Sequence, residues 1–384
     1  MELKNKLEIP HILKKIEDSF TIWFKQSKSF LLLEEPAYDV FHLYEKGIQQ
    51  KEITKICQKK YGDKEEHISQ FVSEIIQYIH HYNNPGNQEI ISKLSSLKDR
   101  AKKVTFLPPV HYKFGTKVVT ILYDDEYLKF AIHPLLAHLE VGEIEESSYT
   151  LECFQQEEIA ILKMNGKLIE AFSVEEMHYY TGAVRQLLYS ILCDRDYNDW
   201  MAMLHASGIV FNKSAILFSA ASGSGKSTIS AILKAKGYDY INDDFIATDK
   251  NGKVYPFPAA ISIKEGSVKV LSEFYPELLN AETKETFIGK MVKYLPVHNI
   301  SKDLLKGTTV RAFVFVNYTE KDEFIFEKVS KKYALQYLLE ETWVNPKPEY
   351  VSGFFDWIQR TEFYNLQYSK TEEALDVVQK IFNS

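Results

Sequence analysis

The sequence predicts an α/β fold, a sheet with flanking helices, preceded by a small α+β domain. An apolar run within residues 214–219 is typical of a strand whose two faces are both buried. A loop of small residues, 220–225, follows at once, and a helix with apolar residues on one face begins at Lys226. Residues 1–85 show another pattern, that of a hairpin and three short helices. We therefore expect two domains of unequal size in this 384-residue chain.

The N-terminal domain is expected to have a winged-helix-like outline. Its third helix is the clearest element, because apolar residues recur at helical spacing from Ile68 to Ile79. That helix contains three glutamates and neither lysine nor arginine. It is therefore poorly suited to a groove lined with phosphates, and we expect no nucleic-acid partner. The expected elements are a hairpin at 20–24 and 30–33 and helices at 36–47, 51–61 and 65–82.

The order of these elements and the run 30–41, FLLLEEPAYDVF, resemble PqqD and related domains that hold precursor peptides for modifying enzymes. The resemblance implies a peptide partner for residues 1–85. Such domains add a leader peptide as a strand to an exposed sheet edge. The alternative is a helical adaptor that only packs on the second domain.

The boundary of this domain is expected near residue 85, where Pro85-Gly86 breaks the helical pattern. Residues 86–104 then form a polar connector rich in lysine, and residues 105–384 form the second domain. Within that domain, Asn165-Gly166 predicts a tight hairpin between two strand-like runs.

The small-residue loop and the start of its helix have the pattern of a Walker A phosphate-binding loop, with Ala220 in place of the first glycine. Gly223 and Gly225 can take positive φ and turn backbone N–H groups toward an anion. The helix N-terminus adds its partial positive charge. Lys226 supplies a cation for the β- and γ-phosphates, and the Ser227 hydroxyl is suited to Mg²⁺. The residues expected to bind the nucleotide are Ala221, Ser222, Gly223, Ser224, Gly225, Lys226, Ser227 and Thr228.

Two further elements of chemistry flank this loop. Asp243 and Asp244 follow Lys226 by 17 and 18 residues, at the end of a predicted strand at 238–242. Because the carboxyl ends of neighbouring strands face one crevice, these acids should lie beside the γ-phosphate. One can hold Mg²⁺ while the other accepts a proton from a hydroxyl. His205 precedes a predicted hairpin that leads into the loop strand, and its spacing alone leaves its role open.

His205, the loop at 222–227 and the Asp243-Asp244 pair resemble the catalytic domain of HPr kinase/phosphorylase, especially the HPr-kinase-like proteins found beside peptide-modifying enzymes. The resemblance covers residues 105–384. It implies that His205 and Lys226 are active-site residues, that Ser227 is a metal ligand, and that Asp244 is the general base. In the kinase hypothesis that follows, Asp243 supports the metal.

The chain also departs from that family. Ser262 and Lys264 stand where the family has a metal-binding Glu and an Arg, which puts a second metal contact in doubt. Lys264 still supplies a positive charge to the expected catalytic set. The loop linked to the reverse reaction would fall at 295–299, which contains no arginine. We therefore expect a kinase without phosphorolysis.

Composition excludes several classes of protein. The formal charge of −7 argues against a general nucleic-acid surface. No apolar run reaches the ~18 residues of a membrane span, and the first 30 residues lack a signal-peptide pattern, so we expect no membrane partner. Three widely spaced cysteines favour a reducing compartment and a cytoplasmic location. The oligomeric state is left open, a homo-oligomer included.

These observations lead to one main hypothesis, an ATP- and Mg²⁺-dependent kinase that phosphorylates a Ser or Thr hydroxyl of a peptide or protein held by residues 1–85. A small-molecule kinase is one alternative, since such enzymes also place an acid on the strand after the loop helix. A nucleotide-gated peptide-binding module without transfer activity is the other. The sequence names neither the acceptor nor the role of each aspartate.

Overall fold

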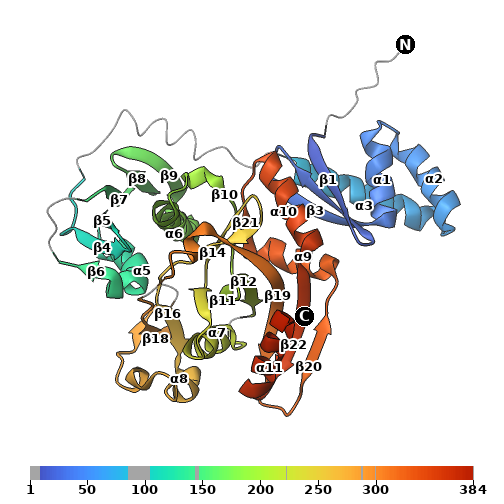
Figure 1. Cartoon of the computed structure of the whole chain (residues 1–384). Coiled ribbons are helices and arrows are strands. Elements are labelled where there is room, and N and C mark those ends of the chain that lie inside the picture. Colours follow the sequence, from blue (N-terminus) through green and yellow to red (C-terminus); the bar gives the residue numbers. More distant parts are fainter. Residues whose placement is uncertain are drawn as a thin grey trace. The chain divides into compact units, whose positions relative to one another are not determined.

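The computed structural model describes residues 9–84, 104–142, 147–221, 223–286, 289–298 and 300–383. It is a mixed α/β structure with several sheets, and its contacts divide the chain into two compact units (Figure 1). The first unit consists of Met1–Gln88 and Val329–Arg360, and the second of Glu89–Lys328 and Thr361–Ser384. The expected connector at 86–104 lies outside the described residues, except for Val104. No helix in the described part of the chain has the length and apolar character that a membrane crossing requires.

The N-terminal segment of the first unit folds as three antiparallel strands followed by three helices. The expected hairpin is present, and a further strand, β1, lies beside it in the order β1-β2-β3. Helix α2 ends at Gly62, whose positive φ of 72° caps it in the left-handed conformation. One face of the sheet packs on the helices through Ile22, Phe24 and Phe41. The bounds are β1 His11–Ile16, β2 Ser19–Phe24, β3 Ser29–Glu34, α1 Glu35–Glu45, α2 Gln50–Tyr61 and α3 Glu65–Asn83.

The second face of this sheet is covered by a segment from the C-terminal third of the chain. Trp23 points away from the α1–α3 face, because side chains alternate along a strand, yet it is only 2% exposed. Its cross-strand partner Phe30 meets Phe355 of α10 with ring centroids 5.9 Å apart. Lys14 pairs with Asp356 at 2.7 Å. The segment comprises α9 Lys331–Glu341, β21 Thr342–Val344 and α10 Pro348–Arg360.

This grouping departs from the expected organisation. The sequence assigned all of 105–384 to the second domain, but residues 329–360 belong by their contacts to the first unit. The reason is the second face of β2, where Trp23 is buried although the three helices of the 1–85 segment pack on the opposite face.

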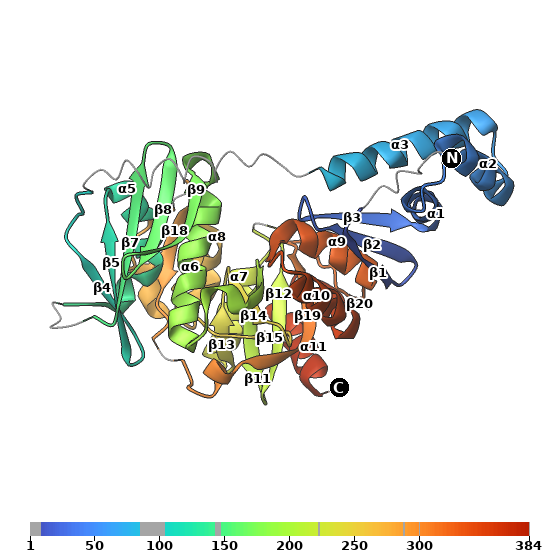
Figure 2. The ribbon, with the colours of Figure 1, turned by 90° about the horizontal axis from the view of Figure 1, so that it is seen from above.

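A six-stranded sheet forms the beginning of the second unit, in the order β6-β4-β5-β7-β8-β9. Helices α5 and α6 pack on it (Figure 2). The core that they share with the sheet includes Tyr123, Leu162 and Leu187. The predicted Asn165-Gly166 turn is confirmed: it joins β8 to β9, with φ of 49° and 76°. The bounds are β4 Val110–Phe114, β5 Lys117–Tyr123, α5 Glu126–Leu136, β6 Glu140–Val141, β7 Tyr149–Gln156, β8 Ile159–Met164, β9 Lys167–Ser173 and α6 Met177–Cys193.

The main sheet of the second unit runs β13-β11-β12-β19, with β22 on the far side of β19. Strand β12 is parallel to β19, β19 is parallel to β22, and β13 runs the same way because β11 is antiparallel to both of its neighbours. Four carboxyl ends therefore meet at one edge of the sheet. The bounds are β10 Trp200–Leu204, β11 Ser207–Phe211, β12 Ser214–Ser219, α7 Lys226–Ala235, β13 Asp239–Asn242, β14 Ile246–Asp249, β15 Lys253–Val254, β19 Thr308–Tyr318, β20 Ile325–Lys328, β22 Glu362–Tyr368 and α11 Thr371–Asn383.

A third, smaller sheet of the second unit has the order β16-β18-β17. It packs on helix α7 and on α8 through Ile232, Ile263 and Leu271. Its first strand ends at Lys264, so this sheet carries the remaining residue of the expected catalytic set. The bounds are β16 Ile261–Lys264, α8 Glu265–Leu271, β17 Lys284–Glu285 and β18 Met291–Leu295.

Candidate functional site

An interrupted strand ladder brings His205 to the aspartate pair. Strands β10 and β11 follow each other with two residues between them, and they pair with β14 and β13 respectively. The register is continuous across the gap, from the Leu204–Ile246 pair to the Gly208–Asn242 pair. His205 therefore faces the segment that holds Asp243 and Asp244. Because the ladder is open at this level, these side chains can meet at the sheet edge.

The glycine-rich loop lies at the same edge, after β12. Gly223 and Gly225 have φ of 98° and 94°, as an inward turn of the backbone requires. Gly225 caps α7, and its carbonyl accepts the first helical hydrogen bond from the Ile229 N–H at 2.9 Å. The Ser224 N–H donates to the Ala221 carbonyl at 3.1 Å. Ser222, also expected to bind the nucleotide, lies outside the described residues.

Three basic side chains surround the Asp244 carboxylate. Its Oδ1 lies 3.0 Å from His205 Nε2 and 3.8 Å from Lys226 Nζ, and its Oδ2 lies 3.2 Å from a guanidinium nitrogen of Arg185. Loss of hydration alone would raise the pKa of this carboxyl, but the hydrogen bond from His205 and the charges of Lys226 and Arg185 hold it well below its usual range. Its side chain is 57% exposed. Asp244 is thus ionised at neutral pH and accessible to a second molecule.

Asp243 has the opposite environment, since only 5% of it is exposed. Burial raises the pKa of its carboxyl to about 7, against the lowering effects of the Lys226 charge and of a hydrogen bond from the Ser227 hydroxyl. Its Oδ1 has no hydrogen-bond partner in the described part of the chain. The side-chain oxygen of Asn242 accepts from the N–H groups of Asp243 and Asp244, at 2.6 and 3.1 Å, and so fixes the turn that separates the two carboxylates.

Ser227 and Asp243 fit a hard divalent cation. A buried carboxylate oxygen without a partner is costly, and a cation beside it would remove that cost. Within the described ranges, no three His, Cys, Asp or Glu side chains form a cluster that could hold a metal by themselves. Mg²⁺ in particular uses one or two protein oxygens and completes its octahedron with phosphate and water. The pair therefore suits Mg²⁺ carried by a phosphate ligand.

Lys264, predicted from the sequence, lies close enough to Lys226 and Asp243 for their charges to act on it. Burial lowers the pKa of Lys264, and the neighbouring charges of Lys290 and Lys226 lower it further. Two lysines on the same anion site repel each other, so an anion between them would be stabilised. Ser262, two residues earlier, lines the pocket beside the aspartates, but it is not a carboxylate, and the second metal contact that was in doubt has no acidic ligand there.

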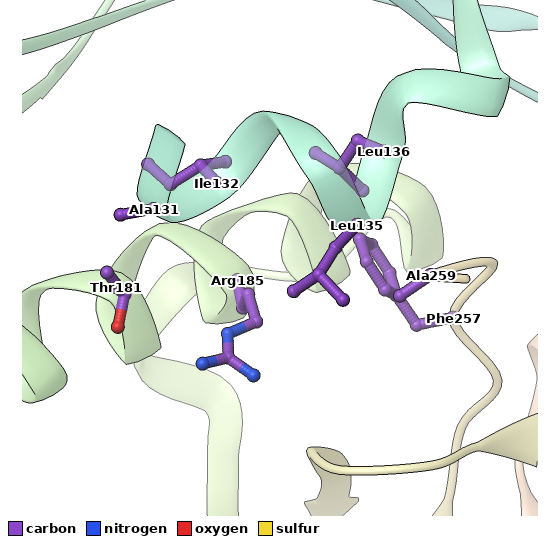
Figure 3. A pocket seen from close by; sticks show the side chains of 8 residues that line it. All are labelled: Ala131, Ile132, Leu135, Leu136, Thr181, Arg185, Phe257 and Ala259. Carbon is purple, nitrogen blue, oxygen red and sulfur yellow. The ribbon is translucent and has the colours of Figure 1, made fainter. Parts of the chain in front are cut away.

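Sequence reasoning missed Arg185. It lies 59 residues before its partner Asp244 and comes from α6, outside the glycine-rich loop and its flanking strands. Its guanidinium carbon also lies 5.1 Å from the centre of the Phe245 ring. Figure 3 shows the Arg185 side chain extending from α6 beside Leu135 of α5. Phe257 and Ala259 also line this cavity. The sequence offered one indication, a single arginine in an otherwise uncharged helical segment, YYTGAVRQLLY. Only the packing of α6 against the sheet shows that this arginine reaches Asp244.

One pocket is lined by several of these residues. Asp243, Asp244 and Arg185 form its polar side, and Leu135 and Phe257 form its apolar side. The adjoining apolar cavity of Figure 3 shares Arg185, Leu135 and Phe257 with it. The ionised carboxylate therefore borders a partly apolar recess, as a site for an organic hydroxyl would.

No protein-family model matches this chain. No curated protein matches it either.

Proposed function

We propose that this protein is an ATP- and Mg²⁺-dependent kinase of the HPr-kinase-like P-loop type, which phosphorylates a Ser or Thr hydroxyl of a bound peptide. One observation carries the proposal: a single sheet edge gathers a glycine-rich loop with Lys226, a buried Asp243–Ser227 pair and an ionised Asp244 opposite His205. A nucleotide-phosphate site and a base for the acceptor would need this set.

The residues divide the work by their environments. Ionised and exposed, Asp244 accepts the hydroxyl proton of the acceptor as the oxygen attacks the γ-phosphorus. The bond from that phosphorus to the bridging oxygen breaks, and the leaving diphosphate keeps its electron pair. Lys226, Lys264 and the loop N–H groups stabilise the charge on the transferring group. His205 and Arg185 hold the Asp244 carboxylate in position from its two oxygens. Mg²⁺, held by Ser227 and Asp243, would neutralise phosphate charge when bound.

We further propose that the first unit, with a winged-helix-like N-terminal segment of the PqqD type, captures the peptide substrate. Strand β3 pairs with β2 alone among the described strands, so its other edge is available for strand addition. Helices α1 and α3 both contact β3. Their apolar residues would give such a strand its selectivity. A cytoplasmic location would supply ATP and keep Cys57, Cys153 and Cys193 as the thiols they are.

The test is mass spectrometry of candidate precursor peptides, and of a small-molecule mixture, after incubation with the full chain, ATP and Mg²⁺. A gain of one phosphate group on a peptide Ser or Thr, lost with Asp244→Asn, supports the proposal. Phosphate appearing only on small molecules would favour the small-molecule kinase. Binding of ATP without transfer to any acceptor would leave a nucleotide-gated binding module and refute the kinase.

A further inference from the structure

A pair of tyrosines ends the two strands on the far side of β12 from the aspartates. Tyr318 is the last residue of β19, and Tyr368 is the last residue of β22. Their rings meet edge to face, with centroids 5.7 Å apart. Tyr368 is buried, whereas Tyr318 is 47% exposed. Ring packing thus supports Tyr318 from one side and leaves part of it open to solvent.

The two tyrosines pack against the glycine-rich loop. The Tyr318 N–H donates to the Ser224 carbonyl at 3.0 Å. A Cβ atom at Gly225 would lie 2.8 Å from the Tyr368 hydroxyl and 3.1 Å from the Tyr318 Cβ. Glycine is therefore required at 225 for its approach to the tyrosines as well as for its positive φ. The tyrosines and the loop form one packed surface at the sheet edge.

The order of strands gives the direction of a bound chain of phosphates. The aspartates follow β13, on one side of the loop strand β12, and the tyrosines end β19 and β22, on the other side. A triphosphate whose γ end lies beside Lys226 and Asp244 extends away from them over the loop. Ligands of such sheets bind along the carboxyl ends of the strands, so its other end reaches the ends of β19 and β22.

We propose that Tyr318 is the stacking platform for the base of the nucleoside triphosphate, with Tyr368 holding its ring in place. The inference rests on the proposed nucleotide site and adds the nucleoside end to it. An exposed aromatic face beside a phosphate cradle suits a flat heterocycle, and stacking tolerates any base because every base has a π face. Purine triphosphates of either kind should therefore bind, with only modest preference between them.

The experiment compares ATP with inorganic tripolyphosphate, which has the phosphates but no base. Calorimetry on the full chain with Mg²⁺ gives both dissociation constants for the wild type, Tyr318→Ala, Tyr318→Phe and the control Tyr127→Ala. Tyr127 is similarly exposed, at 52%, but lies on α5. Tyr318→Ala should weaken ATP binding about fivefold or more, the usual size of one base–aromatic stack, and leave tripolyphosphate binding unchanged. Tyr318→Phe and Tyr127→Ala should match the wild type.

Several results would overturn the inference. If Tyr318→Ala binds ATP as tightly as the wild type, the base does not stack on Tyr318. Equal losses for ATP and tripolyphosphate would make Tyr318 a support of the loop instead. If the wild type binds ATP and tripolyphosphate equally well, the base has no stacking platform, but the phosphate site stands. If the wild type binds neither ligand, the proposed nucleotide site, and with it the proposed function, is refuted. Circular dichroism of each variant excludes misfolding as the cause.

Discussion

Replacing Asp244 by asparagine should affect phosphoryl transfer by the proposed kinase without weakening its binding of ATP. The substitution keeps the size of the side chain and removes the base and one negative charge. Loss of a positioned general base typically costs about 10²- to 10⁴-fold in turnover. The same carboxylate lies 3.8 Å from Lys226 Nζ, so it also stands near the expected γ-phosphate and repels it.

The size of that repulsion follows from the exposure of the group. At about 4 Å two unit charges interact by about 1 kcal/mol in a water-like dielectric, which suits a side chain that is 57% exposed. Removing the charge should therefore leave Mg²⁺-ATP binding unchanged or make it up to about fivefold tighter. The expected signature is a lower kcat with an equal or lower dissociation constant for ATP.

Single-turnover transfer of labelled phosphate gives the rate, and calorimetry gives the ATP affinity of the same sample. Asp243→Asn is the matched control: it removes the buried carboxylate beside Ser227, so it should weaken ATP binding in the presence of Mg²⁺. Turnover by Asp244→Asn within threefold of the wild type would exclude Asp244 as the base. If Asp244→Asn weakens ATP binding and Asp243→Asn leaves it unchanged, the roles of base and metal ligand are reversed between the two aspartates.

Three further changes test other parts of the structure. Arg185→Gln removes a charge that lowers the pKa of Asp244, so the acidic limb of the kcat–pH profile should move to higher pH; an unmoved limb would refute the coupling. Because the pKa of Asp243 is raised to about 7 in the fold, its ionisation destabilises the metal-free protein, and the free energy of unfolding should fall from about pH 4 to 7. Urea titrations should show a flatter dependence in Asp243→Asn, and equal slopes would contradict the burial argument. Phe355→Ala empties a fully buried site and should cost about 3–5 kcal/mol by urea unfolding, against near zero for the exposed Tyr127→Ala.

Local chemistry made the loop, its helix and the acidic strand end predictable. The glycines, Lys226 and the apolar face of α7 are consecutive in sequence, and the structure has the expected strand, loop and helix in that order. Gly62 and the Asn165-Gly166 turn likewise act through their own backbone angles. His205 lies 3.0 Å from Asp244, because the two strand pairs share one register.

The parts that escaped prediction depend on partners far away in the chain. Arg185 is one of many charged residues on helices until α6 packs and turns it toward Asp244. The spacing of apolar residues is compatible with the helix α9, but spacing cannot tell which surface an apolar face covers. Strand β1 was missed for a related reason: its burial depends on β2 and α10, and its alternation of apolar and charged residues is weak.

The segment that covers Trp23 lies late in the sequence, and this position has a consequence for synthesis on the ribosome. About 240 residues separate the end of the N-terminal strands and helices from the start of that cover. At a usual elongation rate the nascent chain waits on the order of 10–50 s with an aromatic sheet face uncovered. An uncovered face of this kind binds chaperones and promotes aggregation, so yield in cells should depend on how quickly translation passes residue 360. In fusion proteins that carry residues 1–88 without residues 329–360, this aromatic face should stay exposed permanently.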